Sequence, residues 1–307
     1  MKNLFVIWVV LVITLLASLD TQAATIDKEN TSKKQHAAVV ESATWGNKRI
    51  TGSGNIIEKE IKLSGKYSTI YVCRAVKVIM ENRTDKKVVI SADDNVMEYV
   101  VCKVEGGKLT ATIDNKINSI SNVNVKIYLP KSEKIDKIST ASGGEAHIYP
   151  TIKTTSLTIE ASSGSKVDIT TAEVGKLVID TSSAGTIKGS FKSESSANLA
   201  ASSAGKIDIT LLGKEVKCEA SSGANIELNG QANKLNAEAS SAADINAKTF
   251  TAENVYAAAS SGADVDVFAQ KRLSANASSA GKIRYTGPVD SFDVSKNASS
   301  GGSVKKM

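Results

Sequence analysis

A corner motif recurs nine times in the second half of the chain, and it constrains the fold more than any other feature. Residues 201–210 read ASSAGKIDIT, and residues 220–229 read ASSGANIELN. Counted from the small residue before each motif, successive copies lie 21, 20, 20, 19, 19, 20, 18 and 21 residues apart. A period near 20 is too short for a helix-pair repeat or a propeller blade. The nine anchors are Thr140, Ala161, Thr181, Ala201, Ala220, Ala239, Ala259, Ala277 and Ala298.

Apolar and polar residues alternate on both sides of each corner. After the anchor Ala201, for example, Ile207 and Ile209 alternate with Lys206 and Asp208. This period of two places one set of side chains inside and the other in solvent. A coil of about 20 extended residues, at about 3.3 Å each, is long enough to make one full turn. The sequence therefore predicts an all-β fold, a single-stranded, right-handed β-helix whose coils of about 20 residues contact only their neighbours.

Stacked coils align equivalent residues into columns. The alternation counted from Ala201 places Ser203 inside the coil and Ser202 outside. A buried hydroxyl must be hydrogen-bonded, and each one in a column can donate to one neighbour and accept from the other. The small residue that follows, Gly or Ala, suits a tight bend. The predicted structural ladder consists of Ser142, Ser163, Ser183, Ser203, Ser222, Ser241, Ser261, Ser279 and Ser300.

The predicted core narrows towards the C-terminus. Two residues before each anchor, the inward column changes from Ile and Leu to Cys and then Ala. We expect either a thinner coil there or a large side chain such as Phe268 that fills the space from another column. The column reads Ile159, Ile179, Leu199, Cys218, Ala237, Ala257 and Ala275.

The sequence divides into four predicted segments, of which the first two precede the β-helix and the last two form it. Residues 1–23 combine Lys2, an apolar run and a small-residue site ending at Ala23, which is typical of a signal peptide. An uncleaved anchor is the alternative, since about 16 apolar residues fall just short of a bilayer span. Residues 24–44 form a flexible polar leader, 45–137 form irregular N-terminal β coils, and 138–307 form the regular repeats. The expected location is the periplasm, the cell surface or the medium.

Charge and cysteine content exclude several classes of protein. The net charge is +6, aromatic residues are only 5%, and Lys and Asp are interspersed, so nucleic-acid binding is not expected. A mildly basic surface favours anionic glycans or anionic membrane surfaces. Three cysteines cannot form a disulfide framework. We expect Cys102 and Cys218 in or near the core, and no integral membrane domain after signal cleavage.

No catalytic, cofactor-binding or metal-binding residue is predicted. A serine type repeated nine times indicates a structural device, because a nucleophilic serine needs one specific base and an oxyanion hole. His147 has no recurring partner and is expected on the surface. Calcium needs six to eight oxygen ligands, and interleaved lysines favour a solvated charged face instead. The outward acidic positions are Asp168, Asp208, Asp244, Asp264 and Asp266.

Two parts of the chain carry a family resemblance. Residues 52–72 read GSGNIIEKEIKLSGKYSTIYV, residues 88–113 read VVISADDNVMEYVVCKVEGGKLTATI, and the Ser-Ser corners follow. Together these resemble the head GIN domain family of putative auto-transporter adhesins, exported bacterial proteins common in Bacteroidetes. The resemblance implies a β-helix, export and a role in adhesion, and it supplies no catalytic residues.

The first functional hypothesis is an exported, non-enzymatic β-helix that acts as an adhesin or a surface- or glycan-binding module. The alternatives are a polysaccharide-active enzyme on the same scaffold and a self-associating structural protein of the envelope. Expected partners are a glycan or a cell-surface protein. The last coil exposes an unpaired edge, so we also expect a homo-oligomer that covers it, or fraying after about Ala277.

Overall fold

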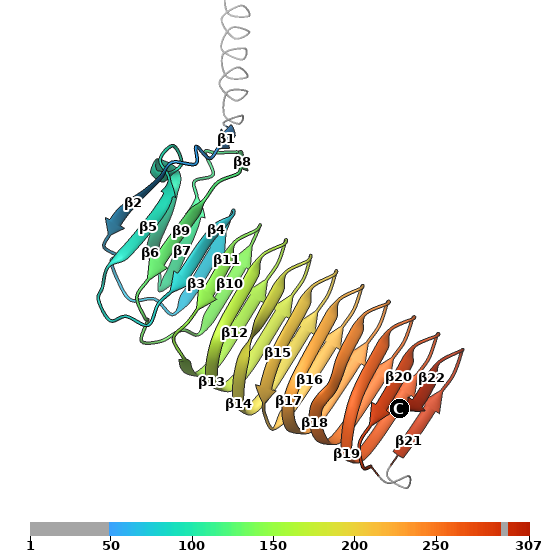
Figure 1. Ribbon diagram of the computed structural model, residues 1–307. Helices are drawn as coiled ribbons and strands as arrows, with labels where there is room; N and C mark the ends of the chain where they lie inside the picture. The colour runs from blue at the N-terminus through green and yellow to red at the C-terminus, as the bar shows by residue number, and fades with distance from the viewer. Residues whose placement is uncertain (1–48, 290–293) are drawn as a thin grey trace, which may run out of the picture. The chain divides into compact units, whose positions relative to one another are not determined.

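The computed structural model describes residues 49–289 and 294–307, and these form an all-β fold (Figure 1). The predicted signal peptide and polar leader lie outside the described residues. The chain divides into two units, residues 1–50 with 115–120 and residues 51–114 with 121–307. A separate two-stranded sheet pairs β1 (Arg49–Thr51) with β8 (Ser119–Ser121). The larger unit is a β-solenoid of about eight turns with coils about 20 residues apart, which confirms the predicted fold class.

The parallel stacking begins with β3 (Thr69–Cys73) and β4 (Val76–Met80). These strands pair in parallel with β10 (Lys137–Ala141) and β11 (Glu145–Ile148) of the next coil. Their other edges pair in parallel with β7 (Lys108–Ile113) and β9 (Val125–Leu129). Antiparallel strands then extend this end of the unit. They are β2 (Ile56–Ile61), β5 (Val88–Asp93) and β6 (Val100–Glu105), with the short 3-10 helix η1 (Met97–Tyr99) between β5 and β6.

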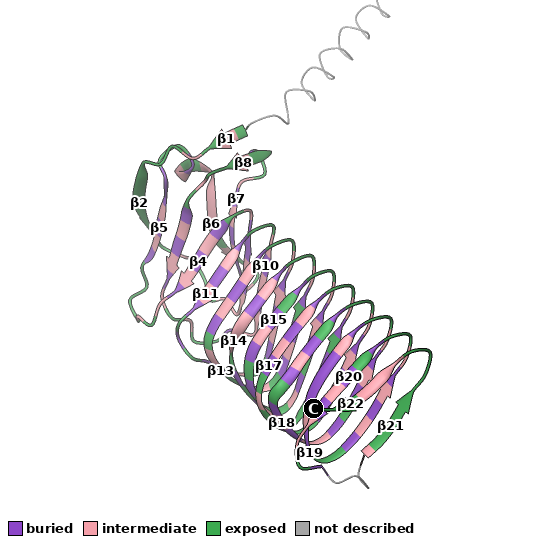
Figure 2. Ribbon diagram, turned by 45° about the vertical axis from the view of Figure 1, so that its right-hand side comes forward, coloured by how far each residue is buried: buried purple, intermediate pink, exposed green. Residues whose placement is uncertain are grey.

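Regular coils follow, each paired in parallel with its neighbouring coils, and the last described coil pairs on one side only. Alternate residues along all but the last two of their strands are buried, as Figure 2 shows, so the period-two pattern of the sequence forms the core. The strands are β12 (Ile152–Ala161), β13 (Lys166–Thr181), β14 (Thr186–Ala201), β15 (Lys206–Leu212), β16 (Glu215–Ala220), β17 (Asn225–Ala239), β18 (Asp244–Ala259), β19 (Asp264–Ala277), β20 (Lys282–Thr286), β21 (Val294–Ala298) and β22 (Ser303–Lys306).

Each corner is a two-residue turn with left-handed backbone. At the corner between β14 and β15, the N–H of Gly205 donates to the carbonyl of Ser202 at 2.8 Å. Ser203 and Ala204 between them have φ of 48° and 60°. This is the geometry of a type I′ turn, and all nine corners share it. The fourth residue must be small: a Cβ on Gly185 would lie 2.2 Å from the carbonyl oxygen of Ala161 in the preceding coil.

The small residues of the predicted narrowing column are buried, and the aromatic side chain that is buried in these coils is not the predicted one. Cys218, Ala237 and Ala257 are fully buried. The expectation that Phe268 fills the space is wrong, because Phe268 is half-exposed. Phe250 is fully buried instead, in register with Gly230 of the preceding coil. Gly230 itself has a φ of 118°, and a Cβ there would lie 2.1 Å from the carbonyl oxygen of Leu211 in the coil before it.

The last described coil carries two lysines at positions that are apolar in the coils before it. Lys296 stands in register with the buried Ala275, and Lys306 with the buried Tyr285. The Nζ atom of Lys296 lies 4.8 Å from the centre of the Tyr285 ring, a cation–π contact. A further coil stacked on β21 and β22 would have to bury two ammonium groups.

Candidate binding groove

The structure aligns the nine predicted ladder serines in one column, but their side chains point outwards. All nine are exposed and left-handed, with φ between 47° and 54°. The predicted inward orientation of Ser203 is therefore wrong. Two consecutive residues with positive φ interrupt the strand alternation on which that prediction depended. The members are Ser142, Ser163, Ser183, Ser203, Ser222, Ser241, Ser261, Ser279 and Ser300.

This column does carry a ladder, and the backbone makes it. The N–H of Ala204 donates to the carbonyl of Ser222 in the next coil at 3.1 Å, and the same bond recurs from Ala75 to Ser300. None of the nine hydroxyls hydrogen-bonds to another described residue. The ladder therefore depends on the turn conformation and not on the serine side chain.

A second serine column lies one residue earlier in eight of the nine corners, and the turn geometry does not explain it. Ala141 occupies this position in the first regular corner and makes the same turn bond at 2.9 Å. The other eight corners have a serine there. Within the part of the chain that the structure describes, their hydroxyls have no hydrogen-bond partner. We call these residues the first-serine column: Ser162, Ser182, Ser202, Ser221, Ser240, Ser260, Ser278 and Ser299.

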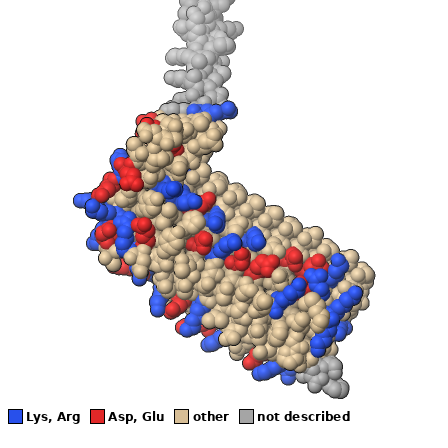
Figure 3. All heavy atoms as spheres, viewed as in Figure 1, with Lys and Arg blue, Asp and Glu red and all other residues tan. Residues whose placement is uncertain are grey.

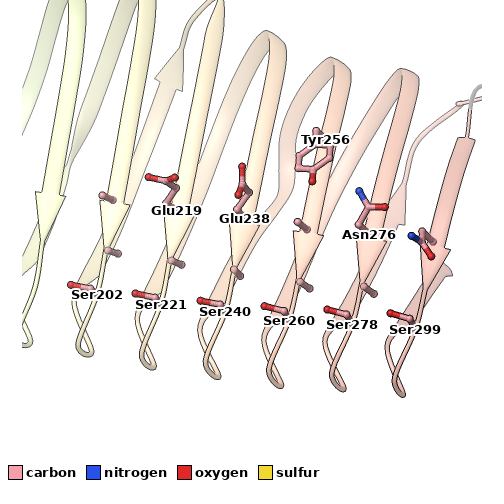
Figure 4. Close-up of a pocket in the computed structure, with 18 of the residues that line it drawn as sticks. Ser202, Glu219, Ser221, Glu238, Ser240, Tyr256, Ser260, Asn276, Ser278 and Ser299 are labelled. Carbon is pink, nitrogen blue, oxygen red and sulfur yellow. The ribbon is translucent and has the colours of Figure 1, made fainter.

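Six members of the first-serine column line a groove of about 660 Å³. Figure 4 shows their side chains stacked in a row, one from each coil, with Glu219 and Glu238 beside them. The lining contains hydroxyls, carboxylates, amides and small apolar groups, and no Lys or Arg. It consists of Asp180, Ala200, Ala201, Ser202, Glu219, Ala220, Ser221, Glu238, Ala239, Ser240, Tyr256, Ala258, Ala259, Ser260, Asn276, Ala277, Ser278, Asn297 and Ser299.

The carboxylates of the groove come from adjacent coils. Glu219 and Glu238 stand in register on β16 and β17, and both point the same way. Glu219 forms an ion pair with Lys217 at 2.6 Å, and Glu238 accepts a hydrogen bond from Asn236 at 3.0 Å. The hydrogen bond and charge of Glu219 raise the pKa of Lys217. Although Lys217 pairs with one of these carboxylates from outside the groove, every charged residue of the lining itself is acidic.

Small residues and one aromatic ring shape the groove. Alanines at 200 and 258 occupy the outward column that holds glutamates at 219 and 238, so the floor is recessed on both sides of the acidic pair. Tyr256 lies two residues before Ala258 on the same face of β18, and 37% of it is exposed. The groove therefore offers a flat aromatic face next to a recess.

Of the acidic positions on the face after the corner, Asp208 and Asp266 form ion pairs with Lys or Arg, whereas Asp244 and Asp264 form none within the described residues. The carboxylate of Asp266 is only 3% exposed and pairs with Lys248 at 2.9 Å and with Arg284 through two hydrogen bonds, one of 2.9 Å. The outward position of Asp266 had suggested a solvated side chain. That prediction is wrong for Asp266. Although burial opposes it, hydrogen bonds from Arg284 and Lys248 lower the pKa of Asp266. Burial and the nearby carboxylates raise the pKa of Asp244.

The remaining predicted positions contact neighbouring side chains or lie largely in the core. Asp208 pairs with Lys188 at 3.0 Å, and the Nε2 atom of His147 lies 3.0 Å from a Glu145 oxygen. All three cysteines are free thiols. Burial raises the pKa of the Cys218 thiol to about 12, so it packs as a small apolar residue, as predicted. Cys102 is also largely withdrawn from solvent, and burial raises its pKa to about 12.

The groove can bind a ligand through hydrogen bonds and stacking. Hydroxyls both donate and accept, carboxylates accept, and amides do both. Sequence reasoning missed this site because it assigned the outward serines no role. The sequence did contain a signal for this site. A serine recurs in eight corners at a position where Ala141 makes the same turn. In residues 49–289 and 294–307, no helix is long and apolar enough to cross a membrane.

Solved structures share this fold. A "putative adhesin" from Parabacteroides merdae is 18% identical, with 85% of this chain and 99% of that chain covered and a TM-score of 0.65. A "putative adhesin" from Parabacteroides distasonis is 20% identical, with 84% and 100% covered and a TM-score of 0.62. A "Putative lipid binding protein" from the same species is 24% identical, with 85% and 100% covered and a TM-score of 0.56.

No curated protein matches the chain significantly. A family model matches residues 66–194 and 189–288, which include the first parallel coils, most of the repeats and nearly the whole groove. The resemblance read from the corner motifs is thereby confirmed. The chain belongs to the family described as "Putative auto-transporter adhesin, head GIN domain".

Proposed function

We propose that the protein is an exported, non-catalytic adhesin module that holds a glycan along its groove. The observation that carries this proposal is the row of six stacked serine hydroxyls without protein partners, beside three carboxylates. Adjacent coils lie about 4.8 Å apart, so the groove presents the same donor and acceptor once per coil. A polymer whose own hydroxyls recur at regular intervals can match such a row.

The lining also defines the kind of glycan. Carboxylates accept hydrogen bonds from sugar hydroxyls or ammonium groups, whereas they repel uronate or sulfate. Tyr256 gives an amphipathic ring against which the C–H face of a sugar can pack. We therefore propose a neutral or amino-bearing polysaccharide. The overall charge of +6 favours anionic glycans, but that charge does not lie in the groove.

The enzymatic alternative is disfavoured by the orientation of the acidic pair. A glycosidase places two carboxyl groups on either side of the scissile bond. Glu219 and Glu238 lie side by side on one floor, and each already has a partner in Lys217 or Asn236. A ligand lying in the groove would meet both carboxylates from the same side.

Lipid binding and self-association are supported less well than glycan binding. One structural neighbour is named a lipid-binding protein, but a floor of serines, acids and amides offers little to an acyl chain. Self-association through the last coil would require the burial of Lys296 and Lys306, which stand at core positions. Burying an unpaired charge costs several kcal/mol.

Export follows from the apolar segment before Ala23 and agrees with the adhesin family. We propose cleavage after Ala23. Mass spectrometry of the exported protein should find an N-terminus near Ala24. An intact Met1 in the membrane fraction would support the uncleaved anchor instead.

The binding proposal has a matched test, because every groove serine is followed by a serine outside the groove. The triple variant Ser221→Ala, Ser240→Ala, Ser260→Ala removes three groove hydroxyls. The control Ser222→Ala, Ser241→Ala, Ser261→Ala makes the same change one residue later, where alanine would adopt the left-handed backbone that Ala204 adopts next to it. At about 0.5–1.5 kcal/mol per hydrogen bond, the groove variant should bind at least tenfold more weakly.

The ligands for this test are a neutral polysaccharide, an amino polysaccharide and a uronate polymer, each measured by calorimetry. We expect the first two to bind the unaltered protein and the control variant. Equal losses in the two triple variants, or preferential binding of the uronate polymer, would refute the groove assignment.

Catalysis is tested on the same polymers by the release of reducing ends. We expect none from the unaltered protein. If release occurs and disappears in the variant Glu219→Gln, Glu238→Gln, then the module is an enzyme and the non-catalytic proposal is wrong.

A further inference from the structure

Charge is distributed unevenly along the solenoid. Residues 149–267 contain ten Lys and Arg against fourteen Asp and Glu, whereas residues 268–307 contain seven Lys and Arg against two Asp. Figure 3 shows the consequence on one face, where acidic side chains gather along the middle coils and basic ones at the last coils. Within the regular repeats, the excess positive charge is thus concentrated at the C-terminal end of the stack.

One outward column forms ion pairs as far as Arg284, which pairs with Asp266, whereas Lys305 in the last described coil forms none with a described carboxylate. Lys188 and Asp208 occupy one outward column in adjacent coils and pair at 3.0 Å. Further along that column, Arg284 is followed by Lys305. Like charges directly opposite each other destabilise a sheet. In the described residues, neither Lys305 nor Lys282 has a carboxylate within ion-pair distance.

Closing the core does not require these outward lysines. Lys296 and Lys306 already stand at core positions of the last coil, where they oppose stacking of a further coil. Lys282 and Lys305 point outwards and add positive charge without covering the core. We call the four residues Lys282, Lys296, Lys305 and Lys306 the basic end.

We propose that the basic end docks on a membrane surface that contains anionic phospholipids. Charge complementarity to the phosphate groups selects the partner. The edge of the last coil is exposed and carries long, flexible ammonium groups, and Met307 beside them is 52% exposed. Such an edge matches a planar array of headgroups better than a single chain in a cleft. A second copy presenting the same end would be repelled by like charge.

The proposal does not depend on glycan binding, and neutralising substitutions test it. Each lysine near an anionic surface contributes about a fivefold increase in affinity. The variant Lys282→Gln, Lys305→Gln should therefore bind roughly 25-fold more weakly to vesicles of phosphatidylcholine and phosphatidylglycerol. Because neither lysine forms an ion pair with a described carboxylate, the variant should melt close to the unaltered protein, and it should retain groove binding.

The matched control is Lys176→Gln, Lys192→Gln, which removes two exposed charges on earlier coils. We expect it to sediment with the anionic vesicles like the unaltered protein. Neither protein should bind pure phosphatidylcholine, and added salt should release both from anionic vesicles.

Three outcomes would overturn the proposal. The first is equal binding to anionic and neutral vesicles, and the second is an equal loss in the two variants. The third is tight binding to soluble dextran sulfate without binding to anionic vesicles, which would identify a polyanionic chain as the partner of this end.

Discussion

The two ends of the solenoid are closed in different ways. At the N-terminal end, β7 and β9 pair with the first parallel coil, and β6, β5 and β2 extend the sheet further. Leu109 and Ile127, which face the core from these strands, are fully buried. At the other end, β21 and β22 each pair on one side only, and lysines replace apolar residues. One end is covered by more structure, and the other is protected by charge, a device known from edge strands.

This difference predicts that the same kind of substitution has very different effects at the two ends. Ile127→Ala deletes a fully buried side chain in β9 and should lower the free energy of unfolding by about 2–5 kcal/mol. Val304→Ala lies in the half-exposed β22 and should cost about 1 kcal/mol or less. Urea denaturation of both variants measures the two values, and equal losses would mean that the ends are equally packed.

Replacing the core-position lysines should convert the C-terminal end into an associating edge. In the variant Lys296→Val, Lys306→Val, pairing with another copy no longer buries two ammonium groups, each of which costs several kcal/mol. We expect light scattering after size-exclusion chromatography to show dimers or larger species.

Lys305→Val provides the control, because Lys305 lies on the same strand but points outwards. It should not associate more than the unaltered protein. If the unaltered protein is already a dimer or trimer joined at this end, as the exposed edge alone had suggested, then the lysines do not protect it.

A single turn substitution should also distinguish the ends. Ser142→Val and Ser300→Val both place a β-branched residue at a φ near 50°, which costs about 1–2 kcal/mol. The full cost should appear at Ser142, between two paired coils. It should be smaller at Ser300, because the last coil can open locally without global unfolding.

Ser142→Gly provides the control for the role of the hydroxyl. Glycine tolerates positive φ, so this variant should melt close to the unaltered protein. A loss as large as that of Ser142→Val would restore the hydroxyl ladder that the sequence had suggested.

Much of this architecture could be predicted from the sequence because a stacked coil repeats its constraints. Val167, Ile207 and Ile226 occupy one column because each must be buried in its own coil. The orientation of the corner was not predictable from alternation alone, since positive φ at Ser203 and Ala204 resets it. The glycines and alanines after the second serine carried that information, because few other residues tolerate the conformation.

The errors in the core and the site have equally local causes. Phe268 lies between the inward Val267 and Ala269, so alternation already placed it outside. Phe250 is buried because a register shift between Ala247 and Thr251 changes the alternation before it. The groove depends on which outward positions happen to be alanine, and no periodic pattern reveals that.

The last prediction concerns pH, because charge contributes to the C-terminal coils. The folded state lowers the pKa of Asp266. The ionised carboxylate of Asp266 therefore stabilises the folded state fully above the ordinary pKa of 3.8, and this stabilisation is lost as the pH falls through the lower folded pKa. The folded state raises the pKa of Asp244, so protonation of Asp244 favours folding and begins above 3.8 during acidification. Asp244 is exposed, and the gain should be only a few tenths of a kcal/mol. Thermal melting between pH 7 and pH 3 should therefore show a small rise before the acid loss. Asp244→Asn should remove the rise and keep the loss, whereas a rise that persists in this variant would exclude Asp244 as its source.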